Sequence, residues 1–194
     1  MNFLAHIYLS NNNPTLQIGN FIADFIKANQ YKHLPKKIQN GIILHRFIDT
    51  FTDAHPIVKQ SKRRLNKRYG LYSGIIIDIF YDHFLAKNWA NYSQINLAEY
   101  TNNFYALLNK NIAILPSGVI KLLPYIIRDN WLLNYASLKG IEKTLIGMNK
   151  RTQLKSQMHL AIVDLKLNYS DFESDFKSFF KNLLNFCAVK IKEF

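Results

Sequence analysis

The sequence predicts an all-α fold. Its 194 residues include only seven Gly and five Pro, which leaves little of the turn chemistry that joins many short strands. Apolar residues instead recur at steps of three and four along most of the chain, as on the buried face of a helix. Hydrophobic residues make up 48% and charged residues 20%, a composition that can bury one core. We therefore expect residues 1–194 to form a single-domain helical bundle.

Four helices are expected in the first half, after a short apolar segment at the start. Asn13 and Pro14 combine a capping residue with a favoured first helical residue, a typical helix start. Pro35 opens the second helix, and Pro56 follows its end. The third helix is short and basic, and Gly70 ends it. The four expected helices span residues 14–28, 35–52, 57–68 and 71–89.

The second half is expected to be helical as well. Shorter helices are predicted over 97–108, 119–127, 131–135 and 141–148. The tail over 154–194 is amphipathic, and its Phe residues indicate one long final helix or a pair of helices. We interpret this aromatic stripe as core rather than as a platform for stacking bases.

Charge and cysteine content narrow the class of protein. The formal net charge of +12 indicates a negatively charged partner, which on charge alone could be nucleic acid, an acidic protein, an anionic membrane surface or a phosphorylated small molecule. The single Cys187 cannot form an internal disulfide, which fits a reducing compartment. The chain lacks a convincing signal sequence and an apolar run long enough to span a bilayer. We expect a cytoplasmic protein without a membrane partner.

Six ionisable residues lie in strongly apolar stretches of the sequence. A buried, unpaired carboxylate costs several kcal/mol, so such groups become neutral, find a cation or bind a metal. Residues four apart share a helix face, so His45 should converge with Asp49, and Asp78 with Asp82. Imidazole and carboxylate together suit Mn, Fe, Mg or Zn, and the absence of thiolates argues against structural zinc. The six residues are Asp24, His45, Asp49, Asp78, Asp82 and His83.

Simpler interpretations exist for each residue. A His and an Asp one helical turn apart can be an ordinary hydrogen-bonded pair, and His6 among apolar neighbours can be a satisfied core histidine. Arg46 could clamp a phosphate or pair with Asp49 or Asp53. The basic segment 59–68 can be a solvated helix face or a docking surface beside the site. The docking candidates are Arg63, Arg64, Lys67 and Arg68.

Six motifs, in order along most of the chain, resemble those of the acyl carrier protein phosphodiesterase family. None would suffice alone, but the combination is specific, and the tail from about residue 165 adds little. The motifs are NFLAHIYLS at 2–10, GNFIADFIK at 19–27, GIILHRFIDTFTD at 41–53, DIFYDHFLAKNW at 78–89, NWLLNY at 130–135 and GMNKR at 147–151.

The resemblance implies an all-α fold related to HD-type phosphohydrolases and a divalent metal, usually Mn²⁺, with Mg²⁺ or Fe²⁺ as alternatives. It implies hydrolysis of holo acyl carrier protein to the apo protein and 4′-phosphopantetheine. An acidic carrier protein suits the basic chain, and no nucleic acid is expected. The family motifs match Asp24, His45, Asp49, Asp82 and His83 as metal ligands, and His6, Arg46 and Asp78 as catalytic associates.

These residues also define a mechanism and its rivals. We expect Arg46 to steady the developing phosphoryl charge, and His6 or His83 to protonate the departing serine oxygen. An HD-type hydrolase of a nucleotide or another small phosphoester would need the same site. A basic helical nucleic-acid-binding protein without catalysis would explain the charge, but it leaves Asp78 and its ionisable neighbours unexplained.

Overall fold

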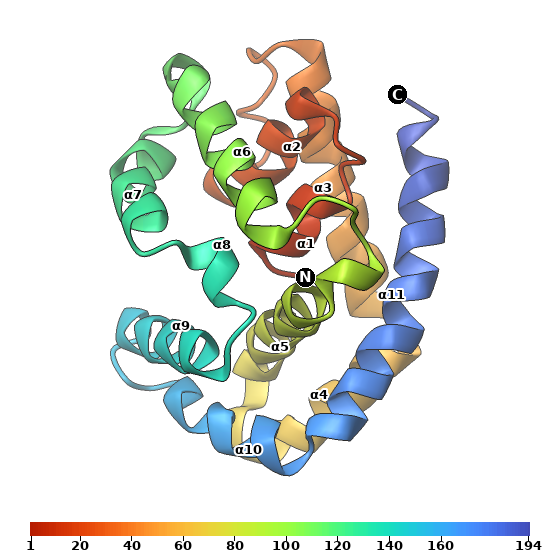
Figure 1. The fold of residues 1–194 in the computed structure, drawn as a ribbon, viewed down its shortest axis with the longest axis vertical. Coiled ribbons are helices and arrows are strands. Elements are labelled where there is room, and N and C mark those ends of the chain that lie inside the picture. Colours follow the sequence, from red (N-terminus) through yellow and green to blue (C-terminus); the bar gives the residue numbers. More distant parts are fainter.

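The computed structural model describes residues 1–194 and contains eleven α-helices and no strand (Figure 1). The all-α prediction is confirmed, whereas the relation to HD-type phosphohydrolases stays a prediction. The helices are α1 Phe3–Tyr8, α2 Pro14–Ile22, α3 Lys36–Ala54, α4 Pro56–Tyr69, α5 Ser73–Lys87, α6 Leu97–Lys110, α7 Ser117–Arg128, α8 Trp131–Asn134, α9 Leu138–Arg151, α10 Ala161–Leu167 and α11 Tyr169–Ile191.

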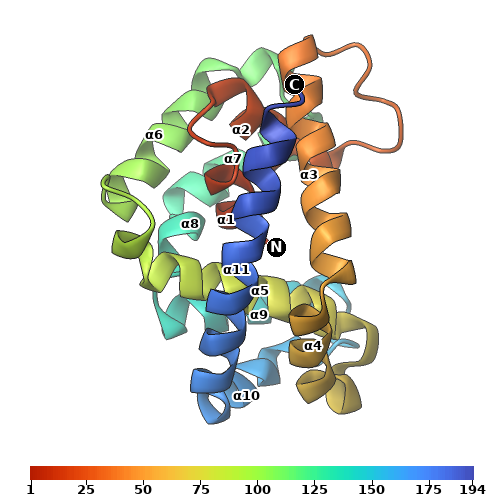
Figure 2. The same cartoon turned by 90° about the vertical axis from the view of Figure 1, so that its right-hand side faces the viewer.

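Helix α5 lies at the centre and is seen nearly end-on in Figure 1. It packs against α1, α4, α9 and α11. Helix α11 runs lengthwise over α3, α4 and α5 (Figure 2). Of the Phe residues that predicted a core stripe, Phe172, Phe176, Phe179 and Phe180 are fully buried, whereas Phe186 is partly buried. One contiguous core of 48 buried residues joins these elements. No helix combines the length and the apolar content needed to span a bilayer.

The structure moves several predicted boundaries. The N-terminal apolar segment forms α1, which was not predicted as a helix. The helix expected to reach Ala28 ends at Ile22 and continues as a 3₁₀ turn over Ala23–Phe25. Backbone geometry explains the stop, because Ile26 is extended and Ala28 has a positive φ of 44°. In the tail, the alternative of two helices, α10 and α11, is confirmed.

Helices α2 and α3 pack backbone to backbone through two glycines. A Cβ atom on Gly19 would lie 2.1 Å from the carbonyl oxygen of Ile38, and one on Gly41 would lie 2.5 Å from that of Leu16. Real side chains cannot approach so closely, so only glycine permits this contact. The close packing brings the end of α2 directly against the middle of α3, where the site described below is built.

Replacing Gly19 with Ala should therefore destabilise the protein. The new methyl group would meet backbone atoms that cannot rotate away, and overpacking of this kind costs about 1–3 kcal/mol or more. Urea unfolding measures the change. Gly147→Ala is the matched control, since a Cβ there meets nothing within 4 Å and an exposed helical Gly→Ala change gains up to about 1 kcal/mol. Equal stability of the two variants would contradict the packing account.

Candidate functional site

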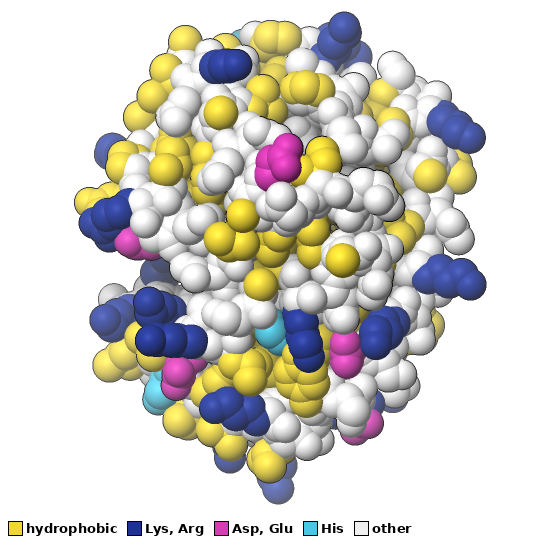
Figure 3. Space-filling view, viewed as in Figure 1, with side chains coloured by type: hydrophobic (Ala, Val, Ile, Leu, Met, Phe, Trp, Pro, Cys, Tyr) yellow, Lys and Arg dark blue, Asp and Glu magenta, His cyan; other side chains and the backbone are white.

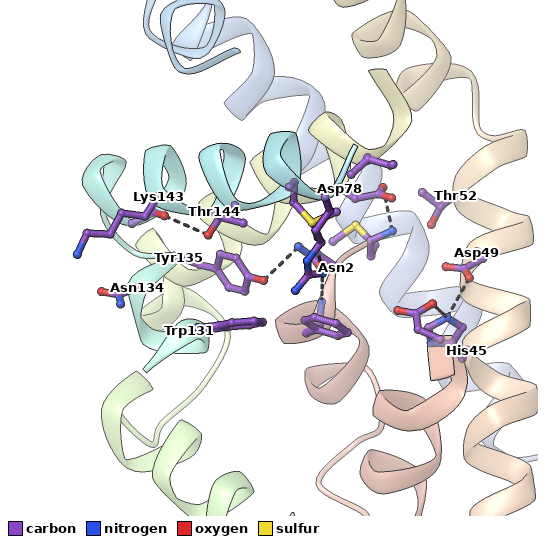
Figure 4. A pocket seen from close by; sticks show the side chains of 18 of the residues that line it. Asn2, His45, Asp49, Thr52, Asp78, Trp131, Asn134, Tyr135, Lys143 and Thr144 are labelled. Carbon is purple, nitrogen blue, oxygen red and sulfur yellow. Dashed lines mark hydrogen bonds and ion pairs between the residues drawn. The ribbon is translucent and has the colours of Figure 1, made fainter. Parts of the chain in front are cut away.

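Two histidines and two aspartates from α1, α3 and the 3₁₀ turn converge on one point. His45 Nε2 lies 3.1 Å from Asp49 Oδ2 and 3.2 Å from Asp24 Oδ1. His6 Nε2 lies 3.3 Å from Asp49 Oδ1, and the two imidazole rings stack with centroids 4.0 Å apart. The predicted convergence of His45 and Asp49 on one face of a helix is confirmed (Figure 4). We call these four residues the His–Asp cluster.

Asn20, at the end of α2, orients both imidazoles. His6 Nδ1 donates to the Asn20 side-chain oxygen at 2.7 Å, and His45 Nδ1 donates to the Asn20 backbone oxygen at 2.8 Å. The fully buried Asn20 amide is itself fixed, because its nitrogen donates to the His6 carbonyl and to Ser10 Oγ. Both Nε2 atoms are thereby turned toward the carboxylates, and in a neutral ring each would carry the free lone pair.

The sequence prediction missed Asn20. Its signal was available, because a polar amide interrupts an otherwise apolar stretch of α2, and buried amides need several partners.

Charge is unevenly shared within the cluster. Burial, together with the positive charge of His45, lowers the pKa of His6 to about 4. Burial also opposes a charge on His45, but the hydrogen bonds that His45 donates to Asp24 and Asp49 outweigh it and raise the pKa of His45 to about 9. Burial would raise the pKa of Asp49, yet the two histidines hold it well below its usual range. The positive charge of His45 thus offsets only part of the negative charge of the two carboxylates in the metal-free protein.

The donor set fits a divalent metal ion. Ligand atoms of His6, His45 and Asp49 lie within 4.8 Å of one another. His6 Nε2 is buried, and although it lies near Asp49 it has no hydrogen bond of acceptable geometry. A buried polar atom without a partner is costly, and an imidazole nitrogen beside carboxylates suits Mn, Fe or Zn.

Asp82, predicted to be a ligand, does not reach the cluster. Its carboxylate accepts hydrogen bonds from the backbone N–H groups of Asn2 at 3.1 Å, Leu4 at 2.8 Å and Ala5 at 3.4 Å. Burial raises the pKa of Asp82 to about 7, against the opposing effects of the Met1 ammonium and these amides. Helix α1 packs on α5, and the backbone N–H groups at its start donate to the Asp82 oxygens. Asp82 therefore fixes α1 in place instead of joining the cluster.

His83 is likewise placed elsewhere. Its Nδ1 donates to the Tyr135 carbonyl at 2.7 Å, and its Nε2 lies 2.8 Å from the Tyr169 hydroxyl. Adjacent residues on a helix point in different directions, and His83 faces α8 and α11 while Asp82 faces α1. The predicted gathering of both residues with Asp24, His45 and Asp49 is therefore corrected. His83 cannot protonate a leaving group at the cluster.

Of the two predicted catalytic residues Asp78 and Arg46, only Asp78 lines the pocket. Asp78 lines the same pocket as the cluster and accepts from the Met1 ammonium at 3.0 Å, beside Asp82 as its spacing predicted. The Arg46 guanidinium instead donates to the Ala28 carbonyl and lies 4.8 Å from the centre of the Tyr31 ring. It does not line the pocket and pairs with neither Asp49 nor Asp53, so the geometry does not support the phosphate-clamp prediction for Arg46.

One pocket of about 880 Å³ connects the cluster to α8 and α9. His45 and Asp49 lie at one end, Asn2 lies in the middle, and Trp131 and Tyr135 lie at the other end (Figure 4). Two cations, Lys143 and Arg151, line the far end and form no ion pair in the structure. Lys and Arg side chains gather over α9 beside an indentation of the outline (Figure 3).

The sequence prediction named neither cation as a site residue. One indication of them was present: Arg151 is the last residue of the motif GMNKR, whereas Lys143 lies in none of the six motifs.

The predicted docking residues on α4 do not line this pocket. Arg64 pairs with Asp175, and Arg68 lies 3.3 Å from Asp164, so these two cations help to hold the C-terminal helices. Arg63 and Lys67 are exposed and form no ion pair. A docking role for the four residues stays a prediction, carried mainly by Arg63 and Lys67.

Comparison with known proteins identifies relatives along the whole chain. The family model described as acyl carrier protein phosphodiesterase matches residues 1–183. A relative named acyl carrier protein phosphodiesterase from Photorhabdus laumondii is 30% identical, over 95% of this chain and 93% of the relative. A relative of the same name from Enterobacter sp. is 30% identical, over 95% of this chain and 96% of the relative. Another from Pectobacterium atrosepticum is 29% identical, over 98% of this chain and 99% of the relative. No solved structure matches.

The corrected role of Asp82 predicts a stability defect. Asp82→Ala would leave buried N–H groups of α1 without acceptors, so the free energy of unfolding of the metal-free protein should fall by about 1–3 kcal/mol or more. Urea denaturation measures it. Glu142→Ala is the control, because the Glu142 side chain is exposed and forms no ion pair, and such changes usually stay within about 0.5 kcal/mol. Wild-type stability in Asp82→Ala would show that the carboxylate does not secure α1.

Proposed function

The chain belongs to the acyl carrier protein phosphodiesterase family, and from this premise we propose that it hydrolyses holo acyl carrier protein to the apo protein and 4′-phosphopantetheine. Phosphodiester hydrolysis requires an activated water and groups that stabilise charge on the phosphoryl oxygens. The observation that supports the proposal most directly is the His–Asp cluster at one end of a large pocket. The cytoplasm, where an acidic carrier protein would be met, is the proposed location.

We further propose that His6, His45 and Asp49, with Asp24 beside them, hold a divalent metal ion. Manganese follows from the family resemblance, and the mixed imidazole and carboxylate donors also suit Fe²⁺, whereas Mg²⁺ prefers oxygen donors. When bound, such an ion supplies Lewis-acid stabilisation of phosphoryl charge and a lowered pKa for water. Asp82 and His83 are not part of this proposed ligand set.

The remaining roles belong to residues that position the cluster or line the pocket. Asn20 would hold each imidazole with Nε2 toward the ion, and hydrogen-bond partners of this kind tune a metal site. His6 is then occupied as a ligand, so another group must protonate the serine oxygen. Asp78 lines the pocket, and burial raises its pKa against the pull of the Met1 ammonium. A carboxyl group that lines the pocket can transfer a proton to a leaving oxygen, so we assign this step to Asp78.

Incubation of the protein with holo acyl carrier protein and Mn²⁺ tests the activity. Mass spectrometry should show loss of the phosphopantetheine mass from the carrier. Asp49→Ala should abolish turnover because Asp49 contacts both histidines, whereas Arg46→Ala should keep most of it because Arg46 faces away from the pocket. An intact carrier after treatment with active, folded protein, together with cleavage of a nucleotide, would favour the rival small-phosphoester hydrolase.

Metal affinity should depend on pH through His45. The raised pKa of about 9 means that His45 binds a proton that an ion must displace, so the apparent affinity for Mn²⁺ should rise from pH 6.5 to pH 9. Calorimetric titration at several pH values measures this. The same shift stabilises the metal-free protein fully below pH 6.5, its unfolded value, and the gain is lost as pH rises through 9. Affinity that is flat over this range would contradict ligation by His45.

A further inference from the structure

We propose that the end of the pocket between α8 and α9 binds the pantetheine chain of the substrate while the phosphate lies at the His–Asp cluster. This inference rests on the proposed function and adds a binding site for the part of the substrate that does not react. The residues assigned to this subsite are Trp131, Tyr135, Thr144, Gly147, Met148 and Arg151.

The shape of the pocket supports a long, thin ligand. The cluster and the α8–α9 wall belong to one continuous pocket of about 880 Å³, near the upper end of the roughly 300–1,000 Å³ usual for small-ligand sites. A phosphate alone would leave most of this volume empty. In Figure 4 the labelled side chains of Trp131 and Tyr135 lie across the pocket from His45 and Asp49, with Asn2 between them. A chain leaving the cluster therefore reaches α8 and α9 without leaving the pocket.

The two substituents of the phosphodiester differ in what can enter. One is a serine of a folded helical protein, which a pocket of this volume excludes. The other is a flexible chain with two amide groups, a hydroxyl, a geminal dimethyl group and a thiol. Only this chain can fill the pocket, so the carrier protein must stay outside, near the end formed by α3 and the 3₁₀ turn. The α4 cations of the docking prediction belong to the helix that directly follows α3.

The lining matches the chemistry of that chain. Trp131 and Met148 offer apolar surface for methyl and methylene groups. Arg151, whose guanidinium lies 5.9 Å from the centre of the Trp131 ring and pairs with no carboxylate, can donate to amide carbonyls. Thr144 Oγ1 already donates to the Gly140 carbonyl at 3.0 Å, which leaves its lone pairs free to accept from amide N–H groups. Apolar walls with a few placed polar groups are typical of small-ligand sites.

Hydrogen bonds within the protein hold the wall in place. The Tyr105 hydroxyl donates to Asn130 Oδ1 and accepts from the backbone N–H of Leu132, each at 3.1 Å. Tyr135 is held on both sides, since its carbonyl accepts from His83 and its hydroxyl accepts from Asn2 at 3.1 Å. Helix α8 is thus tied to α6, α5 and the segment before α1. A preformed wall lowers the entropic cost of ordering a flexible chain.

Gly147 provides a way to close the subsite without touching the cluster. It lines the pocket, and a Cβ atom there meets no atom within 4 Å, so Gly147→Trp introduces bulk at the pocket without a clash at the Cβ atom. Ile146→Trp is the matched control on the same helix, because Ile146 is exposed and does not line the pocket. Helical circular dichroism and thermal unfolding establish that both variants fold.

Kinetics on holo acyl carrier protein give the first readout. Gly147→Trp should lower kcat/KM by about tenfold or more, and Ile146→Trp should leave it within about twofold. An unchanged kcat/KM in Gly147→Trp would overturn the subsite while leaving the proposed function intact. Failure of the wild type on this substrate would refute the proposed function, and the subsite would then stand or fall on binding.

Binding of pantetheine to the metal-free protein is the second readout, and it needs no turnover. Trp131 lines the subsite whereas Trp89 is buried, so tryptophan fluorescence should change saturably with pantetheine in the wild type and in Ile146→Trp. The change should be lost in Gly147→Trp, and Trp131→Phe should remove the signal. Absence of saturable binding to the wild type, or equal affinity in Gly147→Trp, would overturn the proposal.

Discussion

The site depends on a contact between the backbones of α2 and α3. Because Gly19 and Gly41 have no side chains, the two helices approach closely enough for the Asn20 carbonyl to accept a hydrogen bond from His45. The Asn20 side chain extends the same junction to His6 on α1. Three helices therefore meet at one amide, and the orientation of both imidazoles follows from it. A wider spacing of α2 and α3 would separate the histidines from their common partner.

A second layer of polar contacts joins this junction to the central helix. Asp82 secures the first turn of α1, which carries His6, and His83 secures α8, which carries Trp131. Both residues lie on α5 and are almost completely buried. Their buried hydrogen bonds are strong because neither side chain has competing water. Asp82 and His83 thus fix the positions of the two ends of the pocket, although neither residue contacts the His–Asp cluster.

The excess positive charge is only partly free to meet a partner. Ion pairs with Asp164 and Asp175 use Arg68 and Arg64 to fasten the C-terminal helices. Cations that form no ion pair occur at the far end of the pocket, on α9, and on the exposed face of α4. In the proposed arrangement, α4 would meet the acidic carrier and α9 would contact the chain bound in the pocket. Different basic side chains would thereby stabilise the fold, dock the carrier and bind the ligand.

The sequence alone determined the helical class, most helix positions, and the pairing of His45 with Asp49, because these follow from spacing along one helix. It also identified Asp24, Asp78 and His6 as residues of the site region. Tertiary structure decided the rest. Periodicity showed that Asp82 is buried, but only the packing of α1 on α5 showed that backbone amides take up its oxygens. Local sequence places a side chain on a face, whereas its partner is set by whichever distant element packs there, as Asn20, Arg46 and His83 each demonstrate.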